Sequence, residues 1–335
     1  MAEVARVAGV SIATVSYVVN GTRQVRAETR QRVEQAIART GYTHNTLARA
    51  LATSSTDSIG VVVSAITNPF FAEVLGGVDR AAGRSGHTLL FADSHDEPER
   101  EFQVVRGLLQ RRVDGIVLAP STDPARTLDC LAASKTPTVL VDRLVDHRFD
   151  RIGPENEEST ASLVKHLTGL GHHRIGMITG PAGLGTTGER LTGYRAGLDR
   201  AGLPYDASLV AEGRSDIPGG RAATERLLAV PSPPTALVVG NNAMVIGSMR
   251  ALRGADLSIP GDIALVSYED PPGADLFTPP LTAFAQPCAA LGEGAVRMLL
   301  DRLAHPYTAP RAERLAPQLM HRRSCGCPEH PTTGI

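Results

Sequence analysis

The sequence has no apolar stretch long enough to cross a membrane, since none approaches the roughly 18 residues that a spanning helix needs. Its first residues, MAEVARVAGVS, mix polar and apolar side chains and have no continuous apolar centre such as a secretory signal has. Apolar residues make up 42% of the chain and charged residues 21%, which is typical of globular proteins. We therefore expect a cytoplasmic protein.

Cysteine is scarce, with four residues in a chain of 335. They are too few and too scattered for a disulfide framework. Cys325 and Cys327, together with His330, have the spacing of soft metal ligands, but no fourth ligand is evident in the sequence. We expect no metal site and interpret residues 325–335 as a flexible polar tail.

The sequence also lacks a recognisable catalytic set, because neither a nucleophile–base pair nor a metal spacing such as H-E-x-x-H occurs in it. The stretch GPAGLGTTGERL does contain Gly183-x-Gly185-x-x-Gly188, a pattern similar to a dinucleotide fingerprint. However, Gly183 lies beyond the strand end marked by Gly180, and the motif lies in the middle of the chain. We expect neither an enzyme nor a cofactor.

The net charge of the chain, −1, is unevenly distributed. Residues 1–50 contain seven arginines and three acidic residues, a net charge of +4, so the remaining residues carry −5. A basic head on an acidic body favours a polyanion such as DNA as the partner of the head.

The start of the chain has the pattern of a helix-turn-helix domain. Apolar residues three and four apart predict a first helix up to Ala8, which Gly9 ends. Ser11 is a favourable N-cap for a second helix over residues 12–19, and a third helix begins near residue 27 and closes at Gly41. Three short helices, the first two joined by a tight turn, form such a unit.

The second helix has an apolar face of three valines and an opposite, outer face that carries Ile12, Ala13, Ser16, Tyr17 and Asn20. In a helix-turn-helix this outer face enters the major groove, where hydroxyls and amides bind phosphates and methyl groups contact thymine. With the basic charge, the pattern favours DNA binding over a plain helical bundle.

The stretch VARVAGVSIATVSYVVNG resembles the N-terminal signature of the LacI/GalR family of bacterial transcription regulators. The pattern V-A-x-x-A-G-V-S-x-x-T-V-S-x-V-x-N matches at every fixed position. The resemblance implies base contacts from Ile12, Ala13 and Tyr17, although the family usually has arginine where Tyr17 stands. A tyrosine cannot make the bidentate contact of an arginine with guanine, so the operator sequence is not predicted. The predicted DNA-contacting residues of this domain are Ser11, Ile12, Ala13, Thr14, Ser16, Tyr17, Asn20 and Arg26.

The stretch that follows, NTLARALATSSTDSIGVVV, resembles the hinge N-x-x-A-x-x-L of this family, with Asn45, Ala48 and Leu51 at the matching positions. In the family, paired hinge helices of a dimer lie in the minor groove and insert a leucine between base pairs, and Leu51 is at that position. Such a wedge unstacks a base step and bends the duplex. A helix this short is marginal alone and should order only on DNA; a flexible linker remains the alternative.

From Asp57 onward, short apolar runs alternate with amphipathic stretches. The runs SIGVVVS, HTLLFAD, VDGIVLAP, TPTVLVD, HRIGMITG, PTALVVG and DIALVSYED predict buried strands. The alternation predicts an α/β body with parallel sheets, and the number of strands favours two doubly wound lobes with a ligand cleft at the carboxyl ends of the strands.

The body also resembles the effector-binding domain of the same family, which is related in fold to periplasmic sugar-binding proteins; ERLTGYRAGL and PPLTAFAQP are among the matching stretches. We expect a helix-turn-helix domain at residues 1–43, a hinge at 44–56 and an effector-binding and dimerisation domain at 57–324. The resemblance implies that its lobes cross over, with an N-lobe of about residues 57–156 and 286–313 and a C-lobe of about residues 157–285 and 314–324.

Polar and aromatic side chains at strand ends would meet the effector. Carboxylates and amides bind hydroxyls, an arginine pairs with a ring oxygen or carboxylate, and a phenyl ring stacks on a ligand ring, which suits a polyol or a heterocycle. By the family pattern Arg190 is the strongest choice, whereas Asn242 and Glu269 each replace a usual Asp. The predicted effector-binding residues are Phe70, Phe71, Asp93, Asp142, Arg143, Arg190, Asn241, Asn242, Glu269 and Gln286.

The sequence therefore predicts a DNA-binding transcriptional regulator, a repressor whose affinity for its operator is controlled by a sugar-like small molecule. Its partners would be double-stranded operator DNA of near-palindromic sequence and a second copy of the chain. The alternative is a solute-binding protein for a sugar without a DNA role, which the basic N-terminal helices argue against.

Overall fold

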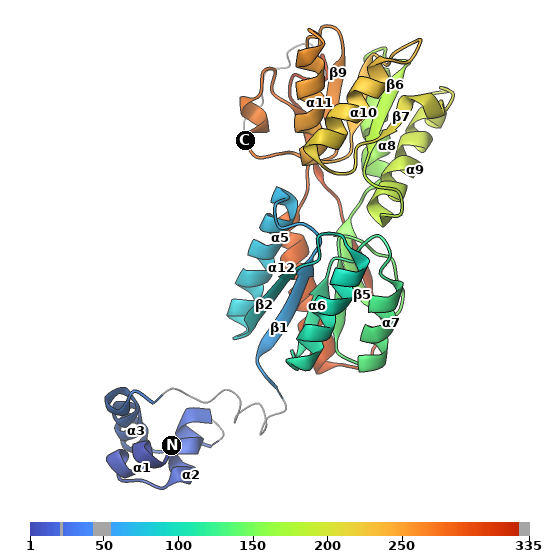
Figure 1. Cartoon of the computed structure of the whole chain (residues 1–335). Helices are drawn as coiled ribbons and strands as arrows, with labels where there is room; N and C mark the ends of the chain where they lie inside the picture. Colours follow the sequence, from blue (N-terminus) through green and yellow to red (C-terminus); the bar gives the residue numbers. More distant parts are fainter. Residues whose placement is uncertain (21–22, 43–54, 328–335) are drawn as a thin grey trace. The chain divides into compact units, whose positions relative to one another are not determined.

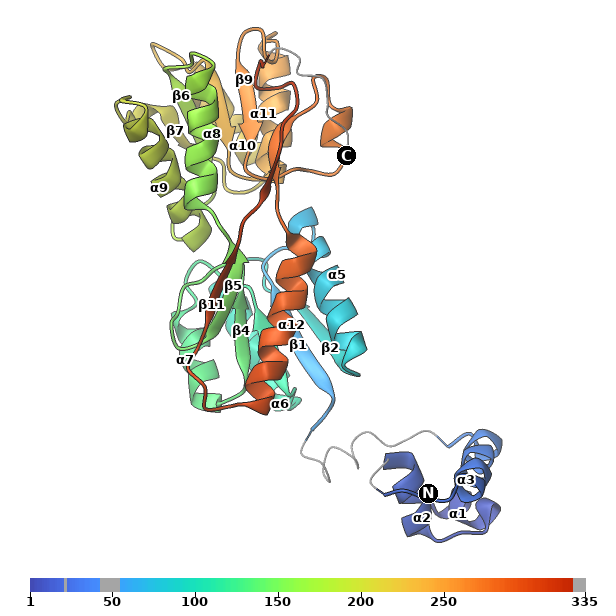
Figure 2. The same ribbon diagram turned by 180° about the vertical axis from the view of Figure 1, so that it is seen from behind.

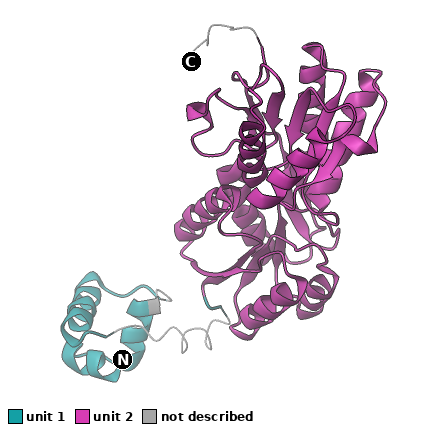
Figure 3. Ribbon diagram, turned by 45° about the horizontal axis from the view of Figure 1, so that its top comes forward, with its two compact units in different colours: residues 1–56 teal, residues 57–335 magenta. Residues whose placement is uncertain are grey.

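The structure is a computed structural model of the chain that describes residues 1–20, 23–42 and 55–327. It divides into two compact units, residues 1–56 and residues 57–335 (Figure 3). In the described parts of the chain no single helix is long and apolar enough to span a membrane; helices Ala2–Ala8 and Ile12–Val19 reach that composition only as a pair bent by 100°.

The first unit contains α1 (Ala2–Ala8), α2 (Ile12–Asn20) and α3 (Ala27–Thr40), which confirms the predicted helices. Gly9 ends α1 in the left-handed conformation at φ 63°, where glycine carries no steric penalty. The Ser11 hydroxyl accepts a hydrogen bond from the Thr14 amide at 3.1 Å, so Ser11 is the N-cap of α2. Val4, Val15 and Val33 are fully buried where the helices meet.

The N-lobe of the second unit is built on a six-stranded parallel sheet in the order β11-β5-β4-β3-β1-β2. Helices α5 and α12 pack together over one face of the sheet, and α6 and α7 cover the other (Figure 1). The elements are β1 (Ser58–Val63), α5 (Pro69–Arg84), β2 (Thr88–Asp93), α6 (Pro98–Gln110), β3 (Gly115–Leu118), α7 (Ala125–Ser134), β4 (Thr138–Val141), β5 (Asp150–Pro154), α12 (Cys288–Ala304) and β11 (Ala312–Leu315).

The C-lobe repeats this plan with the strand order β12-β10-β9-β8-β6-β7, in which β12 alone runs antiparallel to its neighbour β10. Helices α8 and α9 lie on one face and α10 and α11 on the other. The elements are α8 (Glu157–Gly169), β6 (Ile175–Thr179), α9 (Gly185–Arg200), η1 (Ala207–Leu209), β7 (Val210–Glu212), α10 (Ile217–Leu228), β8 (Ala236–Val239), α11 (Asn242–Gly254), β9 (Ala264–Ser267), η2 (Ala274–Leu276), β10 (Thr282–Ala285) and β12 (Gln318–Met320).

Three segments connect the lobes: residues 155–156, residues 286–287 and residues 316–317 (Figure 2). The end of the N-lobe, expected at about residue 313, lies two residues further along, because β11 pairs with β5 as far as Leu315 and Pro154. The expectation that the flexible tail begins at residue 325 is wrong. Cys325 is fully buried against the helices and strands of the C-lobe, and Cys327 packs beside it. Residues 328–335 of the predicted tail lie outside the described residues.

Candidate DNA-contacting helix and effector pocket

The outer face of α2 carries the residues that were predicted to contact DNA. Ser11, Ile12 and Ala13 are exposed, and the Ile12 side chain, at 54%, is among the most exposed large apolar residues of the chain. An isoleucine this open at the first turn of a helix has no folding role on that side. It is therefore available to a partner of this unit.

Further along α2, the side chains of Thr14, Ser16 and Tyr17 are half-buried. The guanidinium of Arg23 lies 5.6 Å from the centre of the Tyr17 ring, within the range of a cation–π contact. Arg26 is exposed and directly precedes α3. Positive charge thus lies beside the outer face of α2, which suits a polyanion.

Four of the residues predicted to contact DNA have side chains outside the part of the chain that the structure describes. Asn45, Ala48 and Leu51, which form the predicted hinge pattern, lie outside the described residues, as does the side chain of Asn20.

A cavity of about 460 Å³ lies between the two lobes of the second unit, within the size range of ligand sites. Eight of the ten predicted effector residues line it: Phe70 and Phe71 from α5, Asp142 and Arg143 after β4, Arg190 from α9, Asn241 and Asn242 at the start of α11, and Glu269 after β9. The topology brings these residues together because parallel strands present their carboxyl ends at one edge of each sheet.

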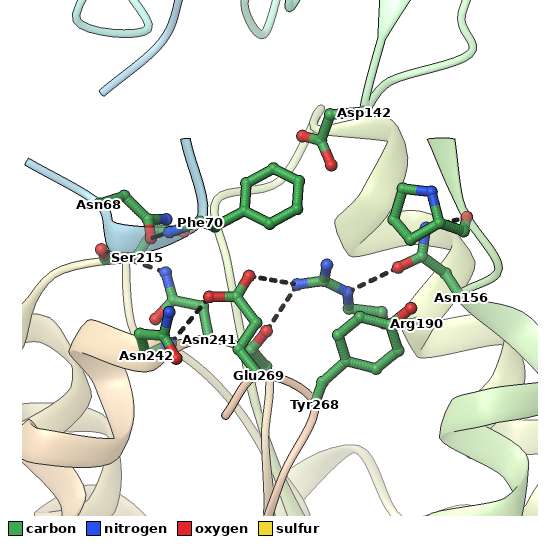
Figure 4. Close-up of polar contacts among 12 residues, drawn as sticks. Asn68, Phe70, Asp142, Asn156, Arg190, Ser215, Asn241, Asn242, Tyr268 and Glu269 are labelled. Atoms are coloured by element: carbon green, nitrogen blue, oxygen red, sulfur yellow. Dashed lines mark hydrogen bonds and ion pairs between the residues drawn. The ribbon is translucent and has the colours of Figure 1, made fainter. Parts of the chain in front are cut away.

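Arg190 is held by several contacts at the C-lobe side of the cavity (Figure 4). Its Nε donates to Asn156 Oδ1 at 2.9 Å, and its Nη1 donates to the carbonyl of Gly240 at 2.5 Å. The guanidinium also lies 3.9 Å from the centre of the Tyr268 ring. A planar cation held on three sides presents its remaining N–H groups in a fixed direction, as a ligand oxygen requires.

Glu269 faces Arg190 with Oε1 and Nη1 3.7 Å apart, and its Oε2 accepts from the Asn242 amide at 3.1 Å. Burial raises the pKa of Glu269 above its usual value, although Arg190 and the Asn242 amide act in the opposite direction. The side-chain oxygen of Asn242 is buried without a protein partner. A buried acceptor of this kind is costly unless a ligand or water donates to it.

The N-lobe side of the cavity holds a second charged group, formed by Asp142 and Arg143. Arg143 makes an ion pair with Asp96, and its Nη2 donates to Ser64 Oγ at 3.1 Å. Burial raises the pKa of Asp142, against the influence of Arg143 and Arg190. In Figure 4 the Asp142 carboxylate and the Phe70 ring face Arg190 across the gap. The two lobes thus offer charged hydrogen-bonding groups and a phenyl face to one space.

Two predicted effector residues do not line the cavity. The Asp93 carboxylate accepts from the amides of Ile66 at 2.9 Å and His95 at 2.8 Å, so it orders the loops after β1 and β2 instead. Gln286 is half-buried, with its side-chain amide atoms buried, in a segment that connects the lobes. For a residue at a strand end, the turn that follows decides whether its side chain points into the cleft or back into a loop.

The sequence interpretation missed several polar residues that line the cavity: Ser64, Thr67, Asn68, Asp96, Thr179, Thr186, Thr187 and Ser215. Asp142 was chosen because it is a polar residue at the carboxyl end of a strand. The same criterion could have found Ser64, directly after β1, and Thr179, at the end of β6. Asn68 precedes Pro69 and caps α5 through its side-chain oxygen, which accepts from the Phe70 amide at 3.0 Å, and an Asn-Pro pair at a helix start is a sequence signal for that role.

Comparisons with known proteins found relatives of both parts of the chain. Residues 1–45 match the model "Bacterial regulatory proteins, lacI family", and residues 164–325 match the "Periplasmic binding protein-like domain". The Escherichia coli K12 ribose operon repressor is 36% identical over 97% of this chain and 99% of its own length. The chain belongs to the LacI family. It is accordingly a DNA-binding transcriptional regulator with an effector-binding domain, and not an enzyme.

Two further proteins are similar to this chain over most of its length. The transcriptional repressor PurR of Haemophilus influenzae PittEE is 33% identical over 90% of each chain. The crystal structure of a lac repressor dimer bound to operator and the anti-inducer ONPF is 30% identical, has a TM-score of 0.86, and covers 96% of this chain and 97% of that one. These likenesses extend over the DNA-binding head as well as the lobes. They do not favour the alternative of a solute-binding protein without a DNA role.

Proposed function

We propose that the chain is a repressor that binds a near-palindromic operator as a homodimer and changes its affinity when a monosaccharide binds between the lobes. One observation carries the proposal: Arg190 and Glu269 are buried and braced at the cleft, opposite Asp142 and Phe70 of the other lobe. The curated relative with 36% identity is named for a ribose operon, so ribose is the first effector to test. Because operator DNA is its target, the protein acts in the cytoplasm.

The cleft chemistry favours a sugar over a purine. Glu269, Asp142 and the side-chain amides of Asn241 and Asn242 place several hydrogen-bonding groups around a small volume. Adjacent hydroxyls on a sugar ring pair with such forked acceptors and donors, and the Phe70 ring packs against the apolar face of the sugar. A purine would use the phenyl faces and could donate N–H groups to the carboxylates, but it lacks hydroxyls, each of which can donate and accept a hydrogen bond at once.

The head reads DNA through the outer face of α2. Ser11, Thr14 and Ser16 supply hydroxyls suited to phosphates, whereas Ile12 and Ala13 supply methyl groups suited to thymine. Tyr17 adds one phenol at the position where this family usually has arginine. The operator should therefore be recognised with fewer guanine contacts and more apolar contacts.

The hinge couples the two sites. We propose that residues 44–56 of the two copies pair on the operator, where Leu51 inserts between base pairs in the minor groove. Closure of the lobes around the effector rotates the two N-lobes of the dimer and changes the spacing of the hinges. Whether the effector releases or strengthens operator binding depends on which lobe arrangement brings the hinges together.

A thermal-shift screen of the full chain tests the effector. Ribose, glucose, hypoxanthine and guanine are added at matched concentrations, with Arg190→Ala as a pocket variant and Arg195→Ala as a control on the exposed side of the same helix. A ligand at 100 times its dissociation constant stabilises by about 2.7 kcal/mol, which is readily measured. We expect ribose to raise Tm in the wild type and in Arg195→Ala but not in Arg190→Ala. A shift with the purines alone would contradict a sugar effector.

A further inference from the structure

Four soft-ligand side chains meet on the C-lobe, outside the effector cavity: His166 from α8, and His321, Cys325 and Cys327 from the chain after β12. Each residue offers one atom that can bind a metal, and these four atoms all lie within 4.8 Å of one another. Cys325 Sγ is 3.5 Å from His321 Nε2, and Cys327 Sγ is 3.6 Å from His166 Nε2.

These separations match the edges of a tetrahedral zinc site. With Zn–S bonds of about 2.3 Å and Zn–N bonds of about 2.0–2.1 Å, a neighbouring sulfur and nitrogen lie roughly 3.5 Å apart. Two of the four sulfur–nitrogen separations in the cluster, Cys325 to His321 and Cys327 to His166, have this length, and all the ligand atoms lie within 4.8 Å of one another. The imidazoles of His166 and His321 lie edge to face with their centres 5.1 Å apart, and each presents its Nε2 atom to a cysteine sulfur.

The backbone is shaped to bring the two cysteines together. Gly326 adopts φ 84°, a conformation that favours glycine, and its amide donates to the Arg323 carbonyl at 3.1 Å. The turn therefore directs Cys325 and Cys327 toward one point. This Cys-Gly-Cys turn is also fixed to the sheet, because the Leu265 amide donates to the carbonyl of Ser324 at 2.8 Å.

A hydrogen bond supports one of the thiol ligands. The Thr282 hydroxyl donates to Cys325 Sγ at 3.3 Å, which stabilises a thiolate at that sulfur. Cys325 is fully buried, whereas His321 is exposed. A site with two thiol and two imidazole ligands is saturated, which is typical of a structural metal and leaves no open position for catalysis.

We propose that His166, His321, Cys325 and Cys327 bind a structural zinc ion that fastens the C-terminal segment to the C-lobe. No fourth ligand was evident in the sequence because the two histidines of this cluster are distant from each other along the chain, and only folding brings them to the cysteines. The third ligand considered from the sequence, His330, lies outside the described residues.

The location gives the metal a definite role. His166 belongs to the helix that follows the first segment connecting the lobes, and the other three ligands follow the third such segment, residues 316–317. Zinc would join these two parts of the chain across the C-lobe. It would thereby anchor one of the three connections about which the lobes move.

The test uses the full chain, reduced and stripped of metal with a chelator, and titrated with Co²⁺ followed by Zn²⁺. We expect one Co²⁺ per chain with the visible absorption of a tetrahedral thiolate complex, which Zn²⁺ removes by displacement. Zn²⁺ should raise Tm by several degrees, since it binds the folded state only.

Cys327→Ser and His166→Gln each remove one ligand that is not fully buried, and Cys130→Ser is the matched control, a half-buried thiol on α7 in the other lobe. We expect the first two variants to bind Co²⁺ more than about 100-fold more weakly, since even loss of a hydrogen bond to a ligand can cost that much. The control should bind like the wild type.

Three outcomes would overturn the proposal. The reduced wild type could bind no Co²⁺ in a tetrahedral site. Both ligand variants could bind it as well as the control, which would indicate non-specific binding. Mass spectrometry could instead find a Cys325–Cys327 disulfide in a chain that takes up no zinc after reduction. Circular dichroism of each variant establishes that a lost signal does not come from an unfolded chain.

Discussion

The Nη1 atom of Arg190 and the Oε1 atom of Glu269 lie 3.7 Å apart at the cleft between the lobes, and both side chains are buried. Arg190 comes from α9, and Glu269 follows β9 at the centre of the C-lobe sheet. Each group compensates part of the cost of burying the other. A ligand hydroxyl that reaches this pair therefore meets a donor and an acceptor whose directions are already set.

Replacing Arg190 with Ala should abolish the effector response. The charged hydrogen bonds that Arg190 can offer a ligand are worth about 1.5–3 kcal/mol each, so effector affinity should fall about 100-fold or more. Operator affinity without effector should stay within about twofold of the wild type. Fluorescence anisotropy with labelled operator, with and without effector, measures both quantities, and Arg195→Ala serves as control. An unchanged effector response would remove Arg190 from the site.

The pH dependence of stability should report on Glu269. Burial raises its pKa in the folded chain above the ordinary 4.5, so the folded protein holds this proton more tightly than the unfolded chain does. The contribution of Glu269 to the free energy of unfolding is therefore largest at pH values below 4.5 and declines as the pH rises through the folded pKa. Glu269→Gln lacks this titration.

Chemical denaturation of the wild type and Glu269→Gln across pH 4–8 measures this contribution. The substitution also removes the ion pair with Arg190, so the two stabilities are compared by their slopes with pH rather than by their absolute values. We expect the wild type to lose stability relative to the variant as the pH rises from about 4.5 toward the folded pKa. Parallel curves at all pH values would contradict a raised pKa.

Tyr17→Arg should change the operator preference without abolishing DNA binding. An arginine at this outer position can make a bidentate contact with guanine, worth about 1–3 kcal/mol of discrimination. Selection of binding sequences from a random DNA pool, compared for the wild type and the variant, should show guanine gained at one position of each half-site. Tyr17→Phe is the matched control. Identical consensus sequences for the wild type and Tyr17→Arg would show that this position does not read bases.

Leu51→Ala should weaken binding to the operator more than binding to unrelated DNA. The wedge acts only where the duplex bends at the specific site, whereas non-specific binding depends mainly on phosphate contacts. Titration of both DNAs at one salt concentration measures the ratio of the two affinities. An equal loss on both would indicate that residues 44–56 are a plain linker.

The elements that the sequence predicted best are those with local signals. Gly9, Ser11 and Gly41 mark the ends of α1, α2 and α3 by their own backbone and capping preferences, and those helices form as expected. Each of the seven predicted apolar runs forms a strand, because a continuous apolar run is also a local signal. Most of the strands that were missed, such as β7 and β12, are short edge strands of three or four residues that are not buried along their whole length, so they have no continuous apolar run.

Side-chain direction and contacts distant in sequence could not be predicted. Asp93 and Asp142 both end strands, yet one turns into a loop and the other lines the cleft. His166 and Cys327 are 161 residues apart, and only the packing of the C-terminal segment against α8 brings them within 3.6 Å. No spacing rule along the chain contains that information.

Deletion of residues 1–53 tests the central claim that the N-terminal head binds operator DNA. The full chain and the truncated chain are titrated with the DNA next to their own gene at about 50 and 200 mM salt, since phosphate contacts weaken steeply over this range. The account predicts that the full chain binds with a strong dependence on salt and that the truncated chain, which retains the separate second unit, does not bind. Equal DNA affinity of the two chains would contradict it.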